Sequence, residues 1–147
     1  MKDETLVYIL VGVLLAFTFY YGGSTIMAGG EAVLYKFAEA IKTFEGWFDG
    51  SISQRNNNPG NLKNRGQAGV IGEDSQGHAI FANYEAGYNA LINQLRLMFY
   101  GGSSIYRPDM SINEVFSKYA EGNSAQYAAF VAGHLGVSPD TRLNELV

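Results

Sequence analysis

The sequence contains no cysteine among its 147 residues. Disulfide bonds, thiolate metal ligands and a cysteine nucleophile are therefore excluded. Its two histidines, His78 and His134, lie far apart along the chain, which argues against a zinc site. We expect no metal and no cofactor.

Clustered positive charge is also absent. The ten lysine and arginine residues are scattered along the chain, and the formal net charge is −4. Proteins that bind nucleic acid contact its phosphates through a basic patch. The sequence therefore predicts no nucleic-acid partner.

Charged side chains are missing from residues 5–30, and Leu6 to Tyr21 is almost wholly apolar. An apolar helix of this length can cross the hydrocarbon layer of a membrane. The sequence predicts a single-pass membrane anchor with a glycine linker in residues 1–30, which contacts lipid through residues 5–27. Residues 31–147 then form one globular domain of ordinary size.

A cleaved signal peptide is the alternative for this N-terminal segment. Its first region should be basic, yet Lys2 is followed at once by Asp3 and Glu4. No small-residue cleavage site directly follows the apolar run. An uncleaved anchor is favoured, while Lys2 on one side against Lys36 and Lys42 on the other leaves its orientation open.

Hydrophobic spacing predicts the first elements of the globular domain. Apolar residues recur every three or four positions from Glu31 to Phe48 and predict an amphipathic helix. The polar stretch from Ser51 to Asn64 predicts a loop. Ala68 to Ala82 places short apolar pieces around a polar centre, which predicts a small hairpin.

Capping signals predict four further helices, so the domain is expected to be mainly α with one small hairpin. Such signals are polar residues before a helix, and glycine after it. They are Asn83 and Gly101, Ser111 with Glu114 for a helix reaching Tyr119, Gly136 as the stop of a helix that begins at Ser124, and Ser138 with Pro139 in the first turn of a last short helix.

Glu45 lies near the end of the first predicted helix, between Phe44 and the run Gly46-Trp47-Phe48. Aromatic neighbours can remove water from its carboxyl group, and the negative end of the helix dipole also disfavours a carboxylate. Both effects raise a pKa, as a general acid for glycosidic cleavage requires. An ordinary exposed glutamate is the alternative that this spacing leaves open.

A loop rich in amides follows, with the sequence Arg55-Asn56-Asn57-Asn58-Pro59-Gly60-Asn61-Leu62. Amides donate and accept hydrogen bonds that suit the hydroxyl and N-acetyl groups of sugars, and they also fold loops through Asx turns. We expect the loop from Arg55 to Asn61 to line a glycan cleft beside Glu45. Amides that only fold the loop are the alternative.

Several motifs together resemble the lysozyme-like lytic transglycosylase domains of bacteriophage structural and lysis proteins. The similarity covers most of Ala38 to Leu143, and it is carried by Phe44-Glu45-Gly46, the amide-rich loop, Ala79-Ile80-Phe81 and Tyr84-Glu85-Ala86-Gly87-Tyr88-Asn89-Ala90-Leu91, with a looser match from Ser117 to Tyr127. The resemblance implies an α+β lysozyme-like fold with a cleft between lobes. It also implies Glu45 as acid and then base, and glycan contacts from Arg55, Asn58, Asn61, Tyr84, Tyr119 and Gln126.

Two of these tyrosines have simpler interpretations as well. Tyr119 could hydrogen-bond the Glu45 carboxyl group or a substrate N-acetyl group, but tyrosines in helices more often belong to the core. Tyr84 could equally serve packing at the start of its helix.

A second catalytic carboxylate is not evident. Asp49 is too close to Glu45 along the chain, and Glu73 with Asp74 lies in a polar hairpin turn. Glycoside hydrolases ordinarily need two carboxylates. Lytic transglycosylases need one, because the N-acetyl group of the substrate assists and the sugar 6-hydroxyl closes an anhydro ring. This favours a transglycosylase that cuts the MurNAc-GlcNAc β-1,4 bond of peptidoglycan, with a hydrolytic lysozyme as the alternative.

The resemblance also implies a phage particle, with virion proteins as partners and a location in the virion membrane or the host cell envelope. A non-catalytic glycan-binding or structural virion module is the alternative from another class. An exposed, freely solvated Glu45 would favour that module. A membrane-anchored scaffold with no glycan role would leave the amide-rich loop unexplained.

Overall fold

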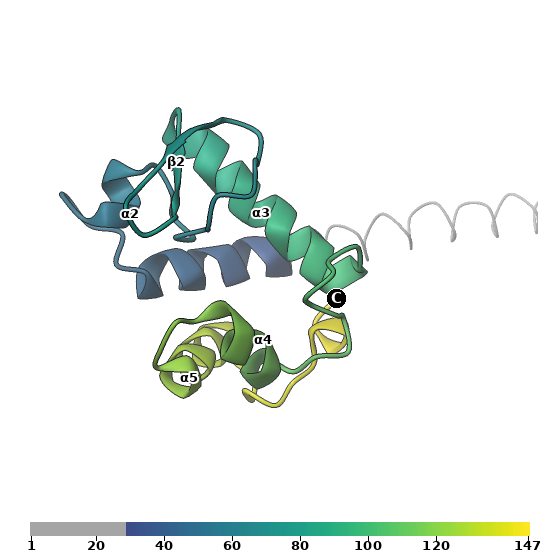
Figure 1. The fold of residues 1–147 in the computed structure, drawn as a ribbon. Coiled ribbons are helices and arrows are strands. Elements are labelled where there is room, and N and C mark those ends of the chain that lie inside the picture. Colours follow the sequence, from purple (N-terminus) through teal and green to yellow (C-terminus); the bar gives the residue numbers. More distant parts are fainter. Residues whose placement is uncertain (1–28) are drawn as a thin grey trace, which may run out of the picture.

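The computed structural model describes residues 29–147. Helices form most of its regular structure, and two short strands form an antiparallel sheet (Figure 1). The expectation of a mainly α chain with one small hairpin is confirmed for this part of the chain. The predicted anchor, residues 5–27, lies outside the described residues. Within residues 29–147, no helix is both long and apolar enough to span a bilayer.

A central helix occupies residues 29–44 and lies between two parts of the fold (Figure 1). On one side Phe37 meets Phe99 of α3 (Tyr84–Tyr100), edge to face at 5.4 Å between ring centroids. On the other side Phe37 stacks at 6.0 Å on Phe116 of α4 (Ile112–Tyr119). Residues 29 and 30, which the sequence placed in a linker, belong to this helix.

The central helix ends earlier than Phe48, and Glu45 is its C-cap residue. Gly46 has a φ of +75°, a conformation that glycine adopts without strain. The Gly46 N–H donates to Thr43 O at 3.1 Å, and the Trp47 N–H donates to Lys42 O at 3.2 Å. This is the Schellman pattern of a helix end. Gly46 thus fixes Glu45 at the C-terminus of the central helix.

The small sheet lies where the sequence predicts it. β1 (Val70–Glu73) pairs with β2 (Ala79–Phe81) in antiparallel register, with an irregularity between Val70 and Gly72. Before the sheet, a single helical turn, α2 (Ile52–Arg55), forms in a segment that the sequence predicted as loop. Ser51 caps this turn, because its side chain accepts a hydrogen bond from the backbone of Gln54.

α3 begins and ends at the predicted caps. The Asn83 side chain accepts a hydrogen bond from the Ala86 N–H at 2.9 Å, and Gly101 follows the last helical residue. Gly87, within α3, lies against the amide loop (residues 55–62). A Cβ atom at Gly87 would come within 1.8 Å of the backbone oxygen of Asn57. Glycine therefore allows α3 and the amide loop to approach each other.

α4 and α5 (Ser124–Leu135) form the opposite side of the fold (Figure 1). The predicted capping box at Ser111 and Glu114 is confirmed, because each side chain accepts the other residue's backbone N–H. α5 ends at Gly136, as predicted, with a φ of +74°. The connection between α3 and α4 joins the two parts of the molecule.

The predicted helix at Ser138 and Pro139 is wrong. These residues form a turn, in which the Thr141 N–H donates to Ser138 O at 3.0 Å. The backbone then pairs with the start of α4, because the Ile112 N–H donates to Thr141 O at 3.1 Å. A short 3₁₀ helix, η1 (Leu143–Glu145), comes only after this pairing.

Candidate active site

Glu45 is half-buried and receives a hydrogen bond from a residue of α5. The Tyr127 hydroxyl donates to Glu45 Oε1 at 2.8 Å. Tyr127 has 2% of its surface exposed, so this bond lies in a largely dry environment. The setting differs from that of an ordinary solvated helix glutamate.

A column of aromatic rings holds Tyr127 in place. Phe44, the neighbour of Glu45, stacks on Tyr127 with ring centroids 3.9 Å apart. The other face of Tyr127 stacks on Phe116 of α4 at 4.2 Å. Stacked rings contribute packing energy beyond the area they bury. The column fixes the direction in which the Tyr127 hydroxyl points.

Burial raises the pKa of Glu45 above the ordinary value for glutamate. Hydrogen bonding to Tyr127 and Asn61 lowers the pKa again, but only in part. The negative charge of Glu121 acts in the same direction as burial. The carboxyl group therefore keeps its proton to higher pH than an exposed glutamate, as a general acid must.

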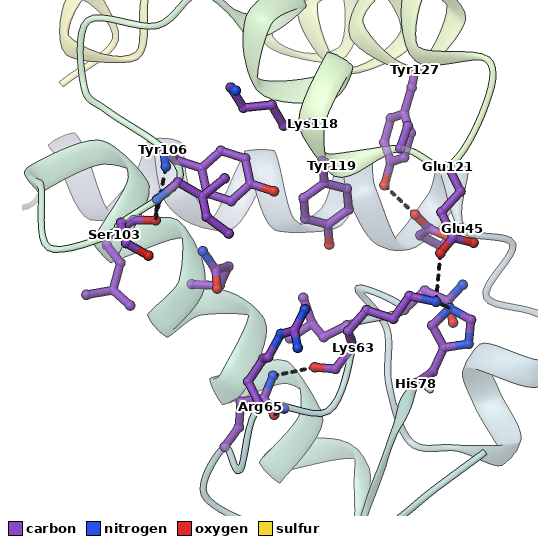
Figure 2. Close-up of a pocket in the computed structure, with 18 of the residues that line it drawn as sticks. Glu45, Lys63, Arg65, His78, Ser103, Tyr106, Lys118, Tyr119, Glu121 and Tyr127 are labelled. Atoms are coloured by element: carbon purple, nitrogen blue, oxygen red, sulfur yellow. Dashed lines mark hydrogen bonds and ion pairs between the residues drawn. The ribbon is translucent and has the colours of Figure 1, made fainter. Parts of the chain in front are cut away.

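Two cavities adjoin at Glu45. The main cavity, about 600 Å³, extends to Tyr106 on the connection between α3 and α4 (Figure 2). The side cavity, about 400 Å³, includes the exposed ring of Phe48. Glu45 and Asn61 line both. The polar and aromatic walls of the main cavity include Glu45, Asn61, Lys63, Arg65, His78, Tyr106, Lys118, Tyr119, Glu121 and Tyr127.

The structure brings Asn61 and Tyr119, of the predicted glycan-binding residues, to the main cavity with Glu45. Asn61 Oδ1 is buried without a hydrogen-bond partner among the described residues. Such a group has unused capacity to accept a hydrogen bond. The Tyr119 hydroxyl donates to Gly60 O at 2.6 Å, so the partner of Glu45 is Tyr127.

The other amides of the loop fold it against the hairpin. Asn58 is fully buried, and its side-chain nitrogen donates to Leu62 O and Ala79 O, both at 2.9 Å. Its oxygen accepts the Leu62 N–H at 2.8 Å. Asn56 and Asn57 likewise bond to Asp74 and to the backbone of β2. The amide-rich composition therefore serves the loop itself at three of its four asparagines.

The remaining predicted glycan contacts lie away from both cavities. Arg55 is exposed at the end of α2, and Gln126 is exposed on α5. Tyr84 packs on Trp47, with ring centroids 5.1 Å apart, and its hydroxyl accepts a hydrogen bond from Lys42. The structure thus places Tyr84 in the packing role that the sequence left as its alternative.

Two charged residues that the sequence did not single out line the main cavity beside Glu45. Lys63 Nζ and Glu121 Oε1 lie 2.7 Å apart, and they come from opposite sides of the cavity. Lys63 Nζ also donates to Gln76 O at 2.9 Å and lies 3.2 Å from His78 Nε2. Three neighbours therefore share the three N–H groups of the ammonium.

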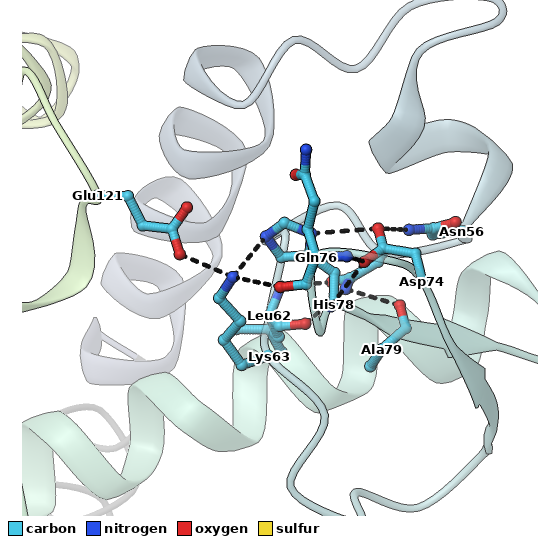
Figure 3. Close-up of polar contacts among 9 residues, drawn as sticks. Asn56, Leu62, Lys63, Asp74, Gln76, His78, Ala79 and Glu121 are labelled. Carbon is cyan, nitrogen blue, oxygen red and sulfur yellow. Dashed lines mark hydrogen bonds and ion pairs between the residues drawn. The ribbon is translucent and has the colours of Figure 1, made fainter.

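Behind Lys63, a chain of polar contacts continues into the hairpin (Figure 3). His78 is buried, and its Nδ1 lies 3.1 Å from Asp74 Oδ2. Asp74 also accepts hydrogen bonds from the Asn56 side chain and from the backbone N–H groups of Gln76 and His78. Burial alone would raise the pKa of Asp74, but these bonds outweigh it and lower the pKa to about 2. In a neutral His78 ring, the charged Asp74 favours the tautomer with the proton on Nδ1, and Nε2 can then accept from Lys63.

Neither Glu73, Asp74 nor Asp49 is among the residues that line the two cavities. Glu121 does line the main cavity, so it is the carboxylate that accompanies Glu45 there. The sequence signal for Tyr127 was its place on the apolar face of a helix, where a buried hydroxyl needs a partner. Nothing local marked Lys63 or Glu121, because their pairing spans the cavity.

No group of three or more histidine or carboxylate side chains within residues 29–147 is arranged to hold a metal ion. Carboxyl, hydroxyl, amide, imidazole, ammonium and guanidinium groups line the main cavity. Comparisons of the chain with protein-family models, with curated proteins and with solved structures give no match.

Proposed function

We propose that residues 31–147 form a lysozyme-like domain that cuts the MurNAc-GlcNAc β-1,4 bond of peptidoglycan as a lytic transglycosylase. The setting of Glu45 carries the proposal: a half-buried carboxyl group with a raised pKa lies where two cavities adjoin. A polymer needs room on both sides of the bond that breaks. Two cavities that share one acid offer this room.

In this mechanism Glu45 serves first as acid and then as base. Its carboxyl proton passes to the glycosidic oxygen as the bond from that oxygen to C1 breaks. The carboxylate then accepts the proton of the sugar 6-hydroxyl, whose oxygen bonds to C1 and closes an anhydro ring. Glu45 ends protonated, as it began, and Tyr127 keeps the carboxyl group oriented by its 2.8 Å hydrogen bond.

A hydrolytic lysozyme is the second candidate, and Glu121 is the observation that favours it. Ion pairing with Lys63 lowers the pKa of Glu121, so this carboxylate stays charged beside Glu45. A charged second carboxylate can activate water in place of the 6-hydroxyl. Muropeptide mass spectrometry separates the two reactions, because transglycosylation leaves anhydro ends and hydrolysis leaves reducing ends.

A non-catalytic glycan-binding module has no need of a desolvated carboxyl group.

The location forms part of the same proposal: a single-pass anchor through residues 5–27 would hold the domain at a virion membrane or host envelope, near virion proteins. This part rests on the sequence alone. Arginine at Val11 and Leu14 would oppose membrane insertion, and release of that variant into the soluble fraction tests it.

Glu45→Gln tests the catalytic assignment. The glutamine keeps the shape of the side chain but has no acidic proton, so cleavage of purified cell walls should fall by about 10²- to 10⁴-fold or more. Asp49→Asn is the matched control, because Asp49 is exposed and bonds to Gln54 outside the main cavity. Clearing of walls by a folded Glu45→Gln variant within about threefold of the wild type would contradict the proposal.

A further inference from the structure

The main cavity has a charge of opposite sign to the protein as a whole. Three of the ten basic residues, Lys63, Arg65 and Lys118, line it, and two carboxylates, Glu45 and Glu121, do so as well. Glu45 is neutral when it is ready to act as an acid. The cavity then carries two positive charges in excess, whereas the whole chain has a net charge of −4.

Two of these cations have no acidic partner among the described residues. Lys63 is neutralised by Glu121 at 2.7 Å. Arg65 and Lys118 are both exposed, and neither lies within ion-pair distance of a described carboxylate. Arg65 precedes β1 and Lys118 lies in the last turn of α4, and they line the cavity from opposite sides (Figure 2).

We propose that Arg65 and Lys118 form an anion-binding subsite for the carboxylates of the peptide stems that peptidoglycan strands carry. This rests on the proposed function and names its preferred substrate, strands that still bear charged peptides. A strand lying in the cavity places its side branches at the walls. Arginine binds carboxylates through two parallel N–H groups, and lysine adds a point charge.

The same two charges also favour the approach of an acidic polymer to an acidic protein. Like charges on strand and protein repel at long range, and a locally positive cavity reverses this repulsion where the strand must bind. The effect weakens with salt, because both cations are exposed. Neutral polymers with the same sugar backbone are not attracted to the cavity in this way.

Binding to the full-length Glu45→Gln variant tests the subsite without turnover. Three soluble probes are used: strands with peptide stems, the same strands after carbodiimide amidation of their carboxyl groups, and strands stripped of peptide by an amidase and then amidated at the lactyl carboxyl groups that the amidase exposes. We expect the intact strands to bind about fivefold to tenfold more tightly than the other two, as two exposed ion pairs allow. Adding Arg65→Gln and Lys118→Gln should remove this preference and leave binding of amidated strands unchanged.

Lys36→Gln with Arg55→Gln is the matched control. It removes the same net charge from two exposed residues that line neither cavity, and it should leave the preference intact. Equal binding of intact and amidated strands, or of intact and stripped strands, would overturn the subsite. If the wild type still cleaves walls in that case, the proposed function stands. No binding of any strand together with no cleavage would overturn both.

Discussion

At the scale of single residues, Glu45 and Tyr127 act on each other's acidity from positions 82 residues apart in the chain. Burial raises the pKa of Glu45, and the Tyr127 hydroxyl partly offsets this by donating to the carboxylate form. A general acid works while it is protonated. The activity should therefore fall as pH rises through the pKa of Glu45, which lies above that of an exposed glutamate.

Tyr127→Phe should move this alkaline limb of the activity profile to higher pH. The variant removes a bond that lowers the pKa of Glu45 and keeps the ring that stacks between Phe44 and Phe116. Loss of the bond should also cost about 1 kcal/mol of unfolding free energy. Wall clearing is measured at closely spaced pH values, together with thermal melts.

Tyr119→Phe is the control for this measurement. Its hydroxyl also lies in the main cavity but donates to Gly60 O at 2.6 Å, away from Glu45. Tyr119→Phe should lower the unfolding free energy by a similar amount and leave the alkaline limb of the activity profile at the same pH. A limb that moves toward lower pH in Tyr127→Phe would contradict the role assigned to Tyr127.

The sequence around Asn58 suggests glycan binding, whereas its hydrogen bonds in the structure stabilise the folded amide loop. Asn58→Ala would leave the buried Leu62 N–H and the oxygens of Leu62 and Ala79 without their partner. We expect a loss of about 3 kcal/mol in unfolding free energy, with the cleavage rate per folded molecule little changed. Asn144→Ala, at an exposed position, should change stability by less than about 0.5 kcal/mol. A large loss of rate at unchanged stability would instead indicate that Asn58 contacts the glycan.

At the scale of elements, the features that were predicted correctly depend on residues close together in the chain. The caps at Asn83, at Ser111 with Glu114, and at Gly136 each satisfy backbone groups within a few residues. The predicted helix at Ser138 failed because the next residues pair with the start of α4, about 30 positions earlier. No local pattern carries that information.

The candidate site shows the same division. The aromatic neighbours of Glu45 at a helix end predict a desolvated carboxyl group, and burial raises its pKa in the structure. Its catalytic role comes from the resemblance and stays a prediction. The sequence did not single out Tyr127, Lys63 or Glu121, because their contacts form only when distant segments meet at the main cavity. Asn58 was assigned to the glycan because its bond to Ala79, 21 residues on, cannot be read from the loop.

The contact between α3 and the amide loop should depend on Gly87. In Gly87→Ala, the new Cβ would lie 1.8 Å from Asn57 O, so α3 or the loop must move. We expect a loss of several kcal/mol, at the upper end for single substitutions. Gly133→Ala is the matched control in α5, where nothing lies within 4 Å. Gly133→Ala should raise the unfolding free energy by up to about 1 kcal/mol, because alanine has a higher helix propensity than glycine. Equal changes in unfolding free energy for the two variants, measured by denaturant titration, would refute the steric argument.

At the scale of the whole molecule, the central helix lies between two parts (Figure 1), and residues of both parts line the main cavity. The aromatic column joins α4 and α5 to the central helix beside Glu45, and the Lys63–Glu121 ion pair joins the two parts where the cavity is open to solvent. The side chain of Lys63 is 36% exposed and that of Glu121 is 71% exposed. Such a pair contributes at most about 1 kcal/mol to stability, so it can break when a strand enters.

Glu121→Gln should widen the distribution of distances between the two parts. Lys63 keeps its contacts with Gln76 O and His78 in this variant and loses only the partner across the cavity. Because the chain has no cysteine, spin labels can be attached solely at Ala68→Cys and Ala125→Cys, two exposed positions on opposite sides of the cavity.

Pulsed electron resonance should give a broader distribution with a longer mean distance for Glu121→Gln than for its labelled parent. High salt should widen the distribution of the parent and leave that of the variant unchanged, since it screens exposed charges. Glu73→Gln removes an exposed carboxylate outside both cavities and should behave like the parent. Identical distributions for the parent and Glu121→Gln at low salt would show that the ion pair does not restrain the opening, and that other contacts, such as the hydrogen bond from Tyr119 to Gly60 O, hold the two parts together without it.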